Sequence, residues 1–126
     1  MFGLIKNKST AYSKFWSVET LDYNYILVIV TTSSRREAKM IVRRLLDEKL
    51  IACANIAGSV SSLFWWNKKV ESAEENVVLM KTRLDLFEKL SETVKALHSY
   101  QVPEIIALPI VKGSKQYMDW LDSYLK

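Results

Sequence analysis

Residues 51–81 read IACANIAGSVSSLFWWNKKVESAEENVVLMK. The first half, Ile51–Trp66, is extended in character, because its large apolar side chains fall on both parities of a strand. Asn67-Lys68 is a predicted turn, since Asn tolerates positive φ, and Lys69–Lys81 returns as a second strand. We therefore predict a hairpin whose strands are more than twice the usual length of about five or six residues.

The segments on either side of the hairpin predict strands and helices in alternation. Tyr25–Thr32 is rich in Ile and Val and is typical of a buried strand, and Ser33 or Ser34 can cap a helix that follows it to about residue 49. After the hairpin, Thr82 with Asp85 resembles a capping box for a second helix. Ile105–Val111 is the fourth predicted strand, with Pro103 in the loop before it. The apolar positions of the three predicted helices are Ala38, Ile41, Val42, Leu45 and Leu46, then Phe87, Leu90, Val94 and Leu97, then Tyr117, Met118, Leu121 and Leu125.

This order, βαββαβ plus a C-terminal helix, is the split-βαβ or ferredoxin-like pattern of the α+β class. In that pattern two helices cover one face of a four-stranded sheet. The strands Tyr25–Val30 and Ile105–Ile110 are apolar on both parities, so we expect both in the centre of the sheet with both faces covered. The aromatic run Phe64–Trp66 on a projecting hairpin would form an exposed apolar patch beside an open edge. Both features predict a symmetric oligomer that is joined through the hairpin.

The composition describes one folded domain. The chain has 126 residues, of which 49% are hydrophobic and 25% are charged, as in an average soluble protein. Its apolar runs, such as Ile26–Val30 and Val77–Met80, fall far below the roughly 18–20 residues that span a bilayer. A single cysteine excludes an intrachain disulfide and fits the reducing cytoplasm. The net charge of +4 does not by itself indicate a nucleic-acid partner.

The first 24 residues differ in composition from the rest of the chain. Lysines lie among Ser and Thr, and no acidic residue precedes Glu19. We predict a flexible N-terminal extension over residues 1–24 and a domain over residues 25–126. Because a Ser-rich, acid-poor segment is also typical of an organellar transit peptide, an organellar location is the alternative to the cytoplasm.

A series of short motifs resembles the CutA divalent-cation tolerance family across residues 25–126. The motifs are Ala52-Cys53-Ala54-Asn55-Ile56, Trp66-Asn67-Lys68-Lys69-Val70-Glu71, Lys81-Thr82, His98-Ser99-Tyr100, Pro103-Glu104-Ile105 and Pro109-Ile110. The resemblance implies a ferredoxin-like homotrimer whose hairpins pair between subunits, and which binds copper or another divalent cation. It also implies a likeness to the trimeric PII signalling proteins, which hold ligands in clefts between subunits. This sequence departs from the family pattern where Ser99 replaces a proline, where Lys68 replaces the turn glycine, and where Thr31 stands in place of a cysteine found in some members.

Three residues are candidate metal ligands. His98 ends the second predicted helix, where it favours the helix dipole; the resemblance instead makes it a ligand in an inter-subunit cleft, since imidazole suits copper. Cys53 is either a small buried apolar residue or a thiolate ligand. Glu104, near the His98 loop, is either a solvated carboxylate or a partner ligand. One His and one Cys in a chain make no site, so a neighbouring chain would supply further ligands.

The resemblance also assigns Lys81, Glu71, Tyr100 and Trp66 to the inter-subunit cleft. Lys81 at the end of a strand can hold an anion beside a Tyr, or can pair with Glu71 across an interface. The sequence does not separate these two interpretations, although a salt bridge is the simpler one.

These observations lead to two hypotheses for binding and argue against catalysis. The first is a trimer that binds a divalent metal, copper above all, and acts in divalent-cation tolerance. The alternative is a PII-like sensor that holds a small anionic ligand between subunits and signals to a partner protein, although no Gly-rich phosphate loop is present. An acylphosphatase-like enzyme would need a glycine in the loop near Arg35, and Cys53 and His98 form no evident nucleophile–base pair. We therefore predict a protein that is not an enzyme.

The aromatic residues Phe64, Trp65, Trp66 and Trp120 would also suit base stacking, as in RNA-recognition domains. However, no stretch resembles the Lys/Arg-Gly-Phe/Tyr motif of those domains, and the chain has only three glycines. We therefore predict packing at an interface for these rings, with no nucleic-acid partner.

Overall fold

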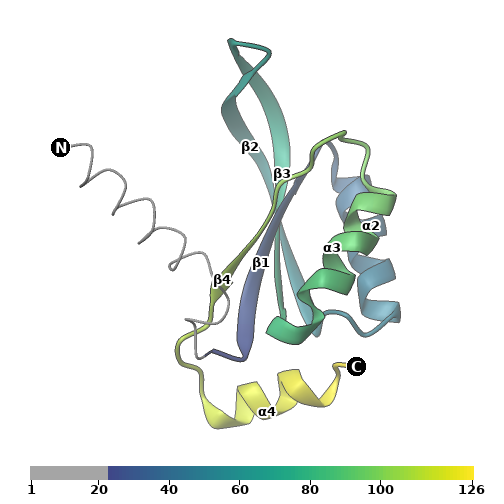
Figure 1. Cartoon of the computed structure of the whole chain (residues 1–126), viewed down its shortest axis with the longest axis vertical. Helices are drawn as coiled ribbons and strands as arrows, with labels where there is room; N and C mark the ends of the chain where they lie inside the picture. The colour runs from purple at the N-terminus through teal and green to yellow at the C-terminus, as the bar shows by residue number, and fades with distance from the viewer. Residues whose placement is uncertain (1–22) are drawn as a thin grey trace, which may run out of the picture.

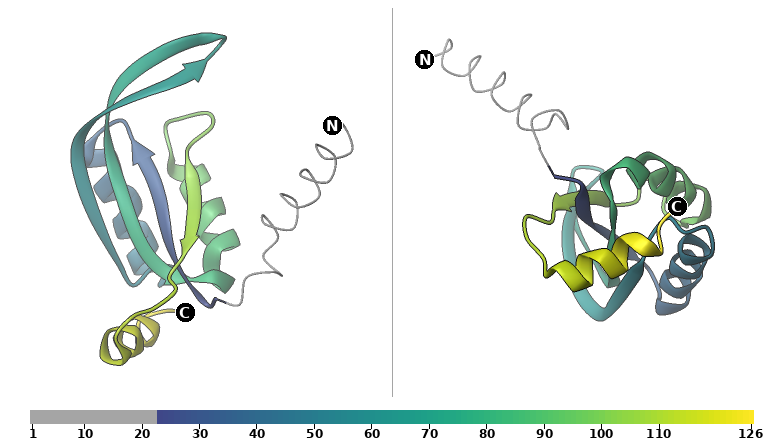
Figure 2. Two further views of the ribbon diagram at one scale, coloured as in Figure 1. Left: turned by 90° about the vertical axis from the view of Figure 1, so that its left-hand side faces the viewer. Right: turned by 90° about the horizontal axis from the view of Figure 1, so that it is seen from below.

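The computed structural model describes residues 23–126. In chain order the elements are β1 (Tyr25–Thr32), α2 (Arg35–Asp47), β2 (Cys53–Trp66), β3 (Lys69–Arg83), the short 3₁₀ helix η2 (Leu84–Leu86), α3 (Phe87–Leu97), β4 (Ile105–Pro109) and α4 (Lys115–Ser123). The strands form one antiparallel sheet in the order β2-β3-β1-β4. The helices α2 and α3 cover one of its faces, and α4 crosses its lower end (Figures 1 and 2). This confirms the predicted α+β, ferredoxin-like fold.

The core lies between the sheet and its two covering helices. On β1, Ile26, Val28, Val30 and Thr32 alternate toward the helices and are buried, while the residues between them are only half-buried. The helices contribute fully buried side chains from one face each. These side chains are Ala38, Ile41 and Leu45 of α2 and Leu90 and Val94 of α3. The predicted helical periodicity is confirmed for these two helices except at Leu46, which is 38% exposed, whereas α4 buries only Leu121.

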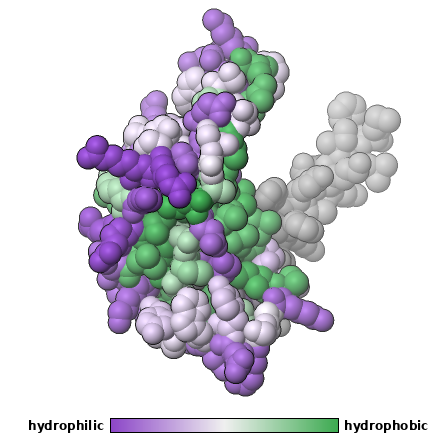
Figure 3. Space-filling model, turned by 180° about the vertical axis from the view of Figure 1, so that it is seen from behind, coloured by the Kyte–Doolittle hydropathy of each residue, from purple (hydrophilic) through white to green (hydrophobic). Residues whose placement is uncertain are grey.

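The β2–β3 hairpin extends far beyond the body of the molecule (Figure 1). Its two strands are 14 and 15 residues long and pair from Cys53↔Lys81 to Trp66↔Lys69, with one irregularity between Ala57 and Val60. At its tip Asn67 and Lys68 adopt φ of 51° and 63°, so the predicted turn is confirmed. Hydrophobic surface runs from the middle of the body up one side of the hairpin, whose tip is hydrophilic (Figure 3).

Two sequence-based predictions about individual elements are wrong. The apolar pattern of Ile105–Ile110 predicts a central strand, but β4 is an edge strand, and Ile106 and Leu108 are 49% and 44% exposed. The spacing of Thr82 predicts a cap for the second helix, but Thr82 is a buried residue of β3 whose hydroxyl donates to the Leu50 carbonyl at 2.6 Å. The pairing of β3 with β1 continues past Thr82 to Arg83, so α3 begins later and has no side-chain cap.

The predicted extension over residues 1–24 lies outside the described residues except for its last two, so its boundary stays a prediction. None of the helices within residues 23–126 is long and apolar enough to cross a membrane.

Candidate functional site

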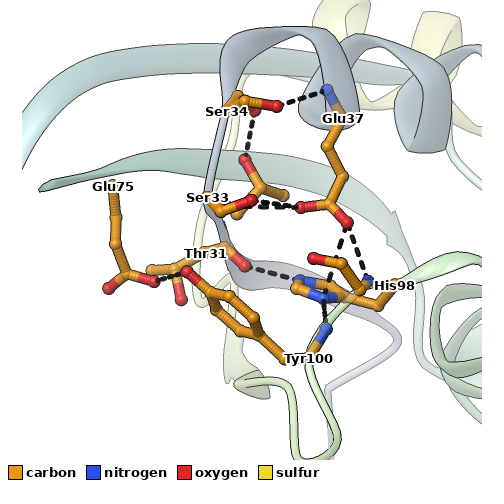
Figure 4. Close-up of polar contacts among 9 residues, drawn as sticks. Thr31, Ser33, Ser34, Glu37, Glu75, His98 and Tyr100 are labelled. Carbon is orange, nitrogen blue, oxygen red and sulfur yellow. Dashed lines mark hydrogen bonds and ion pairs between the residues drawn. The ribbon is translucent and has the colours of Figure 1, made fainter. Parts of the chain in front are cut away.

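His98 lies at the C-terminal end of α3, and its side chain is fully buried. Its Nε2 atom lies 2.7 Å from the Thr31 carbonyl, and its Nδ1 atom accepts the Tyr100 backbone N–H at 3.0 Å (Figure 4). A carbonyl oxygen can only accept and an amide N–H can only donate, so the ring is neutral with its proton on Nε2. Both ring nitrogens are therefore engaged, and neither has a lone pair left for a metal ion in this arrangement.

Glu37, which the sequence analysis missed, joins the start of α2 to the loop after α3. Ser34 caps α2 by accepting the Glu37 N–H at 3.1 Å. The Glu37 carboxylate in turn accepts the Ser99 N–H at 2.7 Å and the Ser33 N–H and hydroxyl at 3.3 and 3.2 Å. Burial raises the pKa of Glu37, but the hydrogen bonds from Ser99 and Ser33 outweigh this and hold it below its ordinary value. The capping-box spacing from Ser34 to Glu37 is the signal that could have identified it.

Tyr100 connects His98 to a second buried carboxylate. Its ring lies against the His98 ring with centroids 4.6 Å apart, and its hydroxyl donates to Glu75 Oε2 at 2.7 Å (Figure 4). Burial, together with the Glu75 carboxylate, raises the pKa of Tyr100 well above its ordinary value, so the phenol stays protonated as a donor. Glu75 is only 7% exposed. The sequence analysis missed it because it lies among polar residues of β3, a pattern that is typical of a solvent-exposed strand.

A cleft of about 660 Å³ lies between the outer half of the hairpin and the loop that follows α3. Tyr100 and Glu104 from the loop, Phe64 and Trp66 from β2, and Glu75 from β3 line it, together with further polar and apolar residues. No Lys, Arg or His is among the described residues that line the cleft. Three of the predicted site residues, Tyr100, Glu104 and Trp66, are thus brought together, with His98 directly behind Tyr100.

The other predicted site residues lie elsewhere on the sheet. Lys81 donates to Asn55 Oδ1 at 3.2 Å and to Cys53 Sγ at 3.8 Å, and the Tyr117 hydroxyl of α4 lies 3.5 Å from the same sulfur. Lys81 pairs with Leu27, which is four residues before Thr31 on β1, so Cys53 is about 13 Å along the strands from the His98 contact.

Glu71 is exposed on the hairpin opposite Phe64 and does not line the cleft. Glu71 is ten residues from Lys81 on the same strand, about 33 Å, so these two residues do not pair within one chain. Within residues 23–126 no group of three or more His, Cys, Asp or Glu side chains is placed to hold a metal ion.

The chain is similar in sequence and in fold to known proteins. Residues 26–124 match the family described as CutA1 divalent ion tolerance protein. The divalent-cation tolerance protein CutA of Archaeoglobus fulgidus is 44% identical over 95 residues, which are 75% of this chain and 92% of that protein. The protein CutA 1, chloroplastic, of Oryza sativa is 43% identical over 120 residues, 95% of this chain and 68% of that protein.

The fold agrees with the sequence comparison. The solved structure of the divalent cation tolerance protein Cut A1 from Thermus thermophilus superposes with a TM-score of 0.79 at 41% identity. The superposition covers 81% of this chain and 99% of the other.

Proposed function

The chain belongs to the CutA1 divalent ion tolerance protein family, and we propose that it acts in divalent-cation tolerance as a homotrimer that binds a divalent metal ion, copper above all, between subunits. Its relatives from Archaeoglobus fulgidus and Thermus thermophilus are named for divalent-cation tolerance, which supports a role for the family in that process.

The hairpin is the observation that carries the oligomer. Leu63, Trp65 and Val70 share one of its faces and are 73%, 74% and 57% exposed, while Phe64 and Trp66 on the other face are 41% and 46% exposed. The strand β2 lies at one edge of the sheet: β3 pairs with one side of it, and no strand of the described residues pairs with the other side. A long apolar edge of this kind leads to association, and closed rotational symmetry lets every subunit bury the same surface.

The metal site, in this proposal, is shared between subunits, because the described part of one chain gathers too few ligands. Of the predicted ligands, Glu104 is exposed at the cleft, and Cys53 has a thiol that only weak contacts occupy. These two residues supply the carboxylate and the soft thiolate that copper accepts. His98 could bind the ion only after losing its bonds to Thr31 or Tyr100, so we assign it a positioning role for the loop that carries Glu104.

Native mass spectrometry of the full chain, with and without stoichiometric Cu(II), tests this proposal. We expect a trimer whose mass increases by bound copper, and a loss of that copper in Cys53→Ala and Glu104→Gln. Glu74→Gln is the matched control, because this exposed carboxylate of β3 lies outside the cleft and bonds only Ser59 and Ser61. A monomer would overturn the oligomer, and a trimer whose copper content is the same in all variants would overturn the ligand assignment.

The second candidate function is the PII-like sensor, which the size of the cleft favours. A cavity of about 660 Å³ is in the range of small-molecule sites and far larger than a bare ion needs. An anionic ligand is not supported, since the described lining has two carboxylates and no cationic side chain, and Lys81 lies elsewhere. Thermal-shift measurements over metal salts and over small molecules of either charge, nucleotides included, separate the two candidates, because a ligand that binds the native state raises the midpoint.

We also propose that the protein has no catalytic role. The family is named for tolerance and not for a reaction, and Cys53 lies far from His98. For location we propose the cytoplasm, with a plastid as the alternative, because relatives from Oryza sativa and Arabidopsis thaliana are named chloroplastic. A fluorescent fusion of the full chain, compared with one that begins at residue 25, distinguishes these locations.

A further inference from the structure

His98 is the single histidine of the chain, and its side chain is fully buried. Because the Nε2 proton is donated to the Thr31 carbonyl at 2.7 Å, the Nδ1 atom has one role, as the acceptor of the Tyr100 N–H at 3.0 Å. A second proton, on Nδ1, would set two donors against each other at that distance. The neutral ring and the present path of the loop after α3 therefore depend on each other.

The Glu37 carboxylate lies beside the same nitrogen atom. Its Oε2 atom is 3.9 Å from His98 Nδ1, which is beyond hydrogen-bond distance, and it accepts the Ser99 N–H at 2.7 Å instead (Figure 4). Burial raises the pKa of Glu37, but the hydrogen bonds from Ser99 and Ser33 hold it below its ordinary value, so this carboxylate is ionised near neutral pH. A shift of about 1 Å would turn its contact with a protonated ring into a charge-assisted hydrogen bond.

The other groups around His98 are compatible with a positive ring. Within residues 23–126, Glu37 is the only charged side chain within ion-pair distance of it, and β1 contributes a backbone carbonyl and no charged side chain. On α3 itself, Lys95 lies one turn earlier and is exposed, while the C-terminal end of the helix favours a cation. The Tyr100 ring, which lies against the imidazole, connects it to the Glu75 carboxylate of β3.

We propose that His98 is a pH-sensitive switch for the loop after α3, residues 98–104. When Nδ1 takes up a proton from solvent, the ring exchanges the Tyr100 N–H for the Glu37 carboxylate, and the backbone of the loop moves. The same loop carries Glu104, so acid would change the lining of the cleft. This inference goes beyond the proposed function, since the switch needs neither a metal ion nor a particular number of subunits.

NMR spectroscopy of the full chain without metal tests the switch, in a titration from about pH 8 to pH 5, the range in which a histidine ordinarily changes its charge. Because the chain has one histidine, one imidazole signal reports its protonation. We expect the Ser99 and Tyr100 amide resonances to shift with the same midpoint as the imidazole signal. The amide of Val28, a fully buried residue of β1, should stay unchanged and shows that the fold is retained.

Three variants assign the response. Glu37→Gln keeps an oxygen that can accept a backbone N–H but removes the charge beside the ring, so we expect the imidazole midpoint to fall by about one pH unit or more. Asp47→Asn is the matched control and should leave the midpoint unchanged, because this exposed carboxylate of α2 pairs with Arg43, about 15 Å further along the helix. In His98→Gln the pH-dependent shift of the Tyr100 amide should disappear.

Three results would overturn the inference. One is an imidazole that stays neutral until the Val28 amide shows that the fold is lost. Another is an imidazole that takes up its proton while the Tyr100 amide stays in place. The third is the same midpoint in Glu37→Gln and Asp47→Asn. These comparisons use chains that retain the histidine, so they remain decisive if His98→Gln does not fold.

Discussion

Replacing Trp65 by Ser should dissociate the proposed trimer. Trp65 is 74% exposed near the end of β2, and a fully buried Trp side chain removes up to about 250 Å² from water. Burial of the exposed part would therefore cover about 185 Å² per subunit, which is worth about 4–5 kcal/mol at 25 cal/mol per Å². Ordering costs of association reduce this value, yet even about 1.4 kcal/mol shifts a dissociation constant tenfold.

Sedimentation equilibrium over a range of protein concentrations measures this effect. We expect the wild-type chain to sediment as a trimer and Trp65→Ser to dissociate at concentrations at least tenfold higher. Met40→Ser is the control, because Met40 is an exposed apolar residue of α2, 46% exposed, on the helical side of the sheet. If Trp65→Ser and the wild type have the same dissociation constant, or if the wild type is monomeric, the burial of the hairpin between subunits is refuted.

Three further predictions concern stability. Thr82→Val keeps the shape of the side chain but leaves the Leu50 carbonyl without its donor, so we expect the free energy of unfolding in urea to fall by about 1–3 kcal/mol. An unchanged midpoint of urea unfolding would contradict this hydrogen bond. The pKa of Glu37 is lowered on folding, so the stabilisation from its carboxylate is present above the unfolded-state pKa and is lost as pH falls through the folded-state pKa. The thermal midpoint of Glu37→Gln should therefore fall less at acid pH than that of the wild type. Midpoints that fall in parallel as the pH is lowered would refute this. Lys68 has a φ of 63°, so Lys68→Gly should raise the thermal midpoint through a gain of up to about 1 kcal/mol, and a lower midpoint would show that the lysine side chain contributes at the tip.

The parts of the fold that depend on residues adjacent in the sequence were predictable. The β1 bounds, a serine cap of α2 and the turn at Asn67-Lys68 each follow from a few adjacent side chains. The structure confirms them and selects Ser34 over Ser33 as the cap. The long hairpin was also predictable, because Ile51–Trp66 is extended in character, Asn67-Lys68 favours a turn, and the return segment reaches the apolar run Val77–Met80. Local propensity and hydrophobic period agree in these segments, so tertiary contacts had nothing to override.

The two wrong predictions come from long-range pairing. Thr82 fits a capping box by local spacing, but β3 pairs with β1 past this point and gives the hydroxyl to Leu50 instead. The β4 strand is apolar on both parities like a central strand, yet only β1 lies beside it among the described residues. A single chain does not show from its sequence whether an apolar strand is covered by its own fold or by another subunit, because both remove the same surface from water.

The sequence by itself determined the order of the elements, the length of the hairpin and the family to which the chain is similar. Only the tertiary structure decided which polar atoms are already engaged. Both ring nitrogens of His98 are hydrogen-bonded to the backbone, one to the Thr31 carbonyl and one to the Tyr100 N–H. Glu75 accepts a hydrogen bond from the Tyr100 hydroxyl, although the two residues are 25 positions apart in the sequence. The physical reason is that a hydrogen bond depends on where donor and acceptor meet in space, whereas the hydrophobic period depends on positions along the chain.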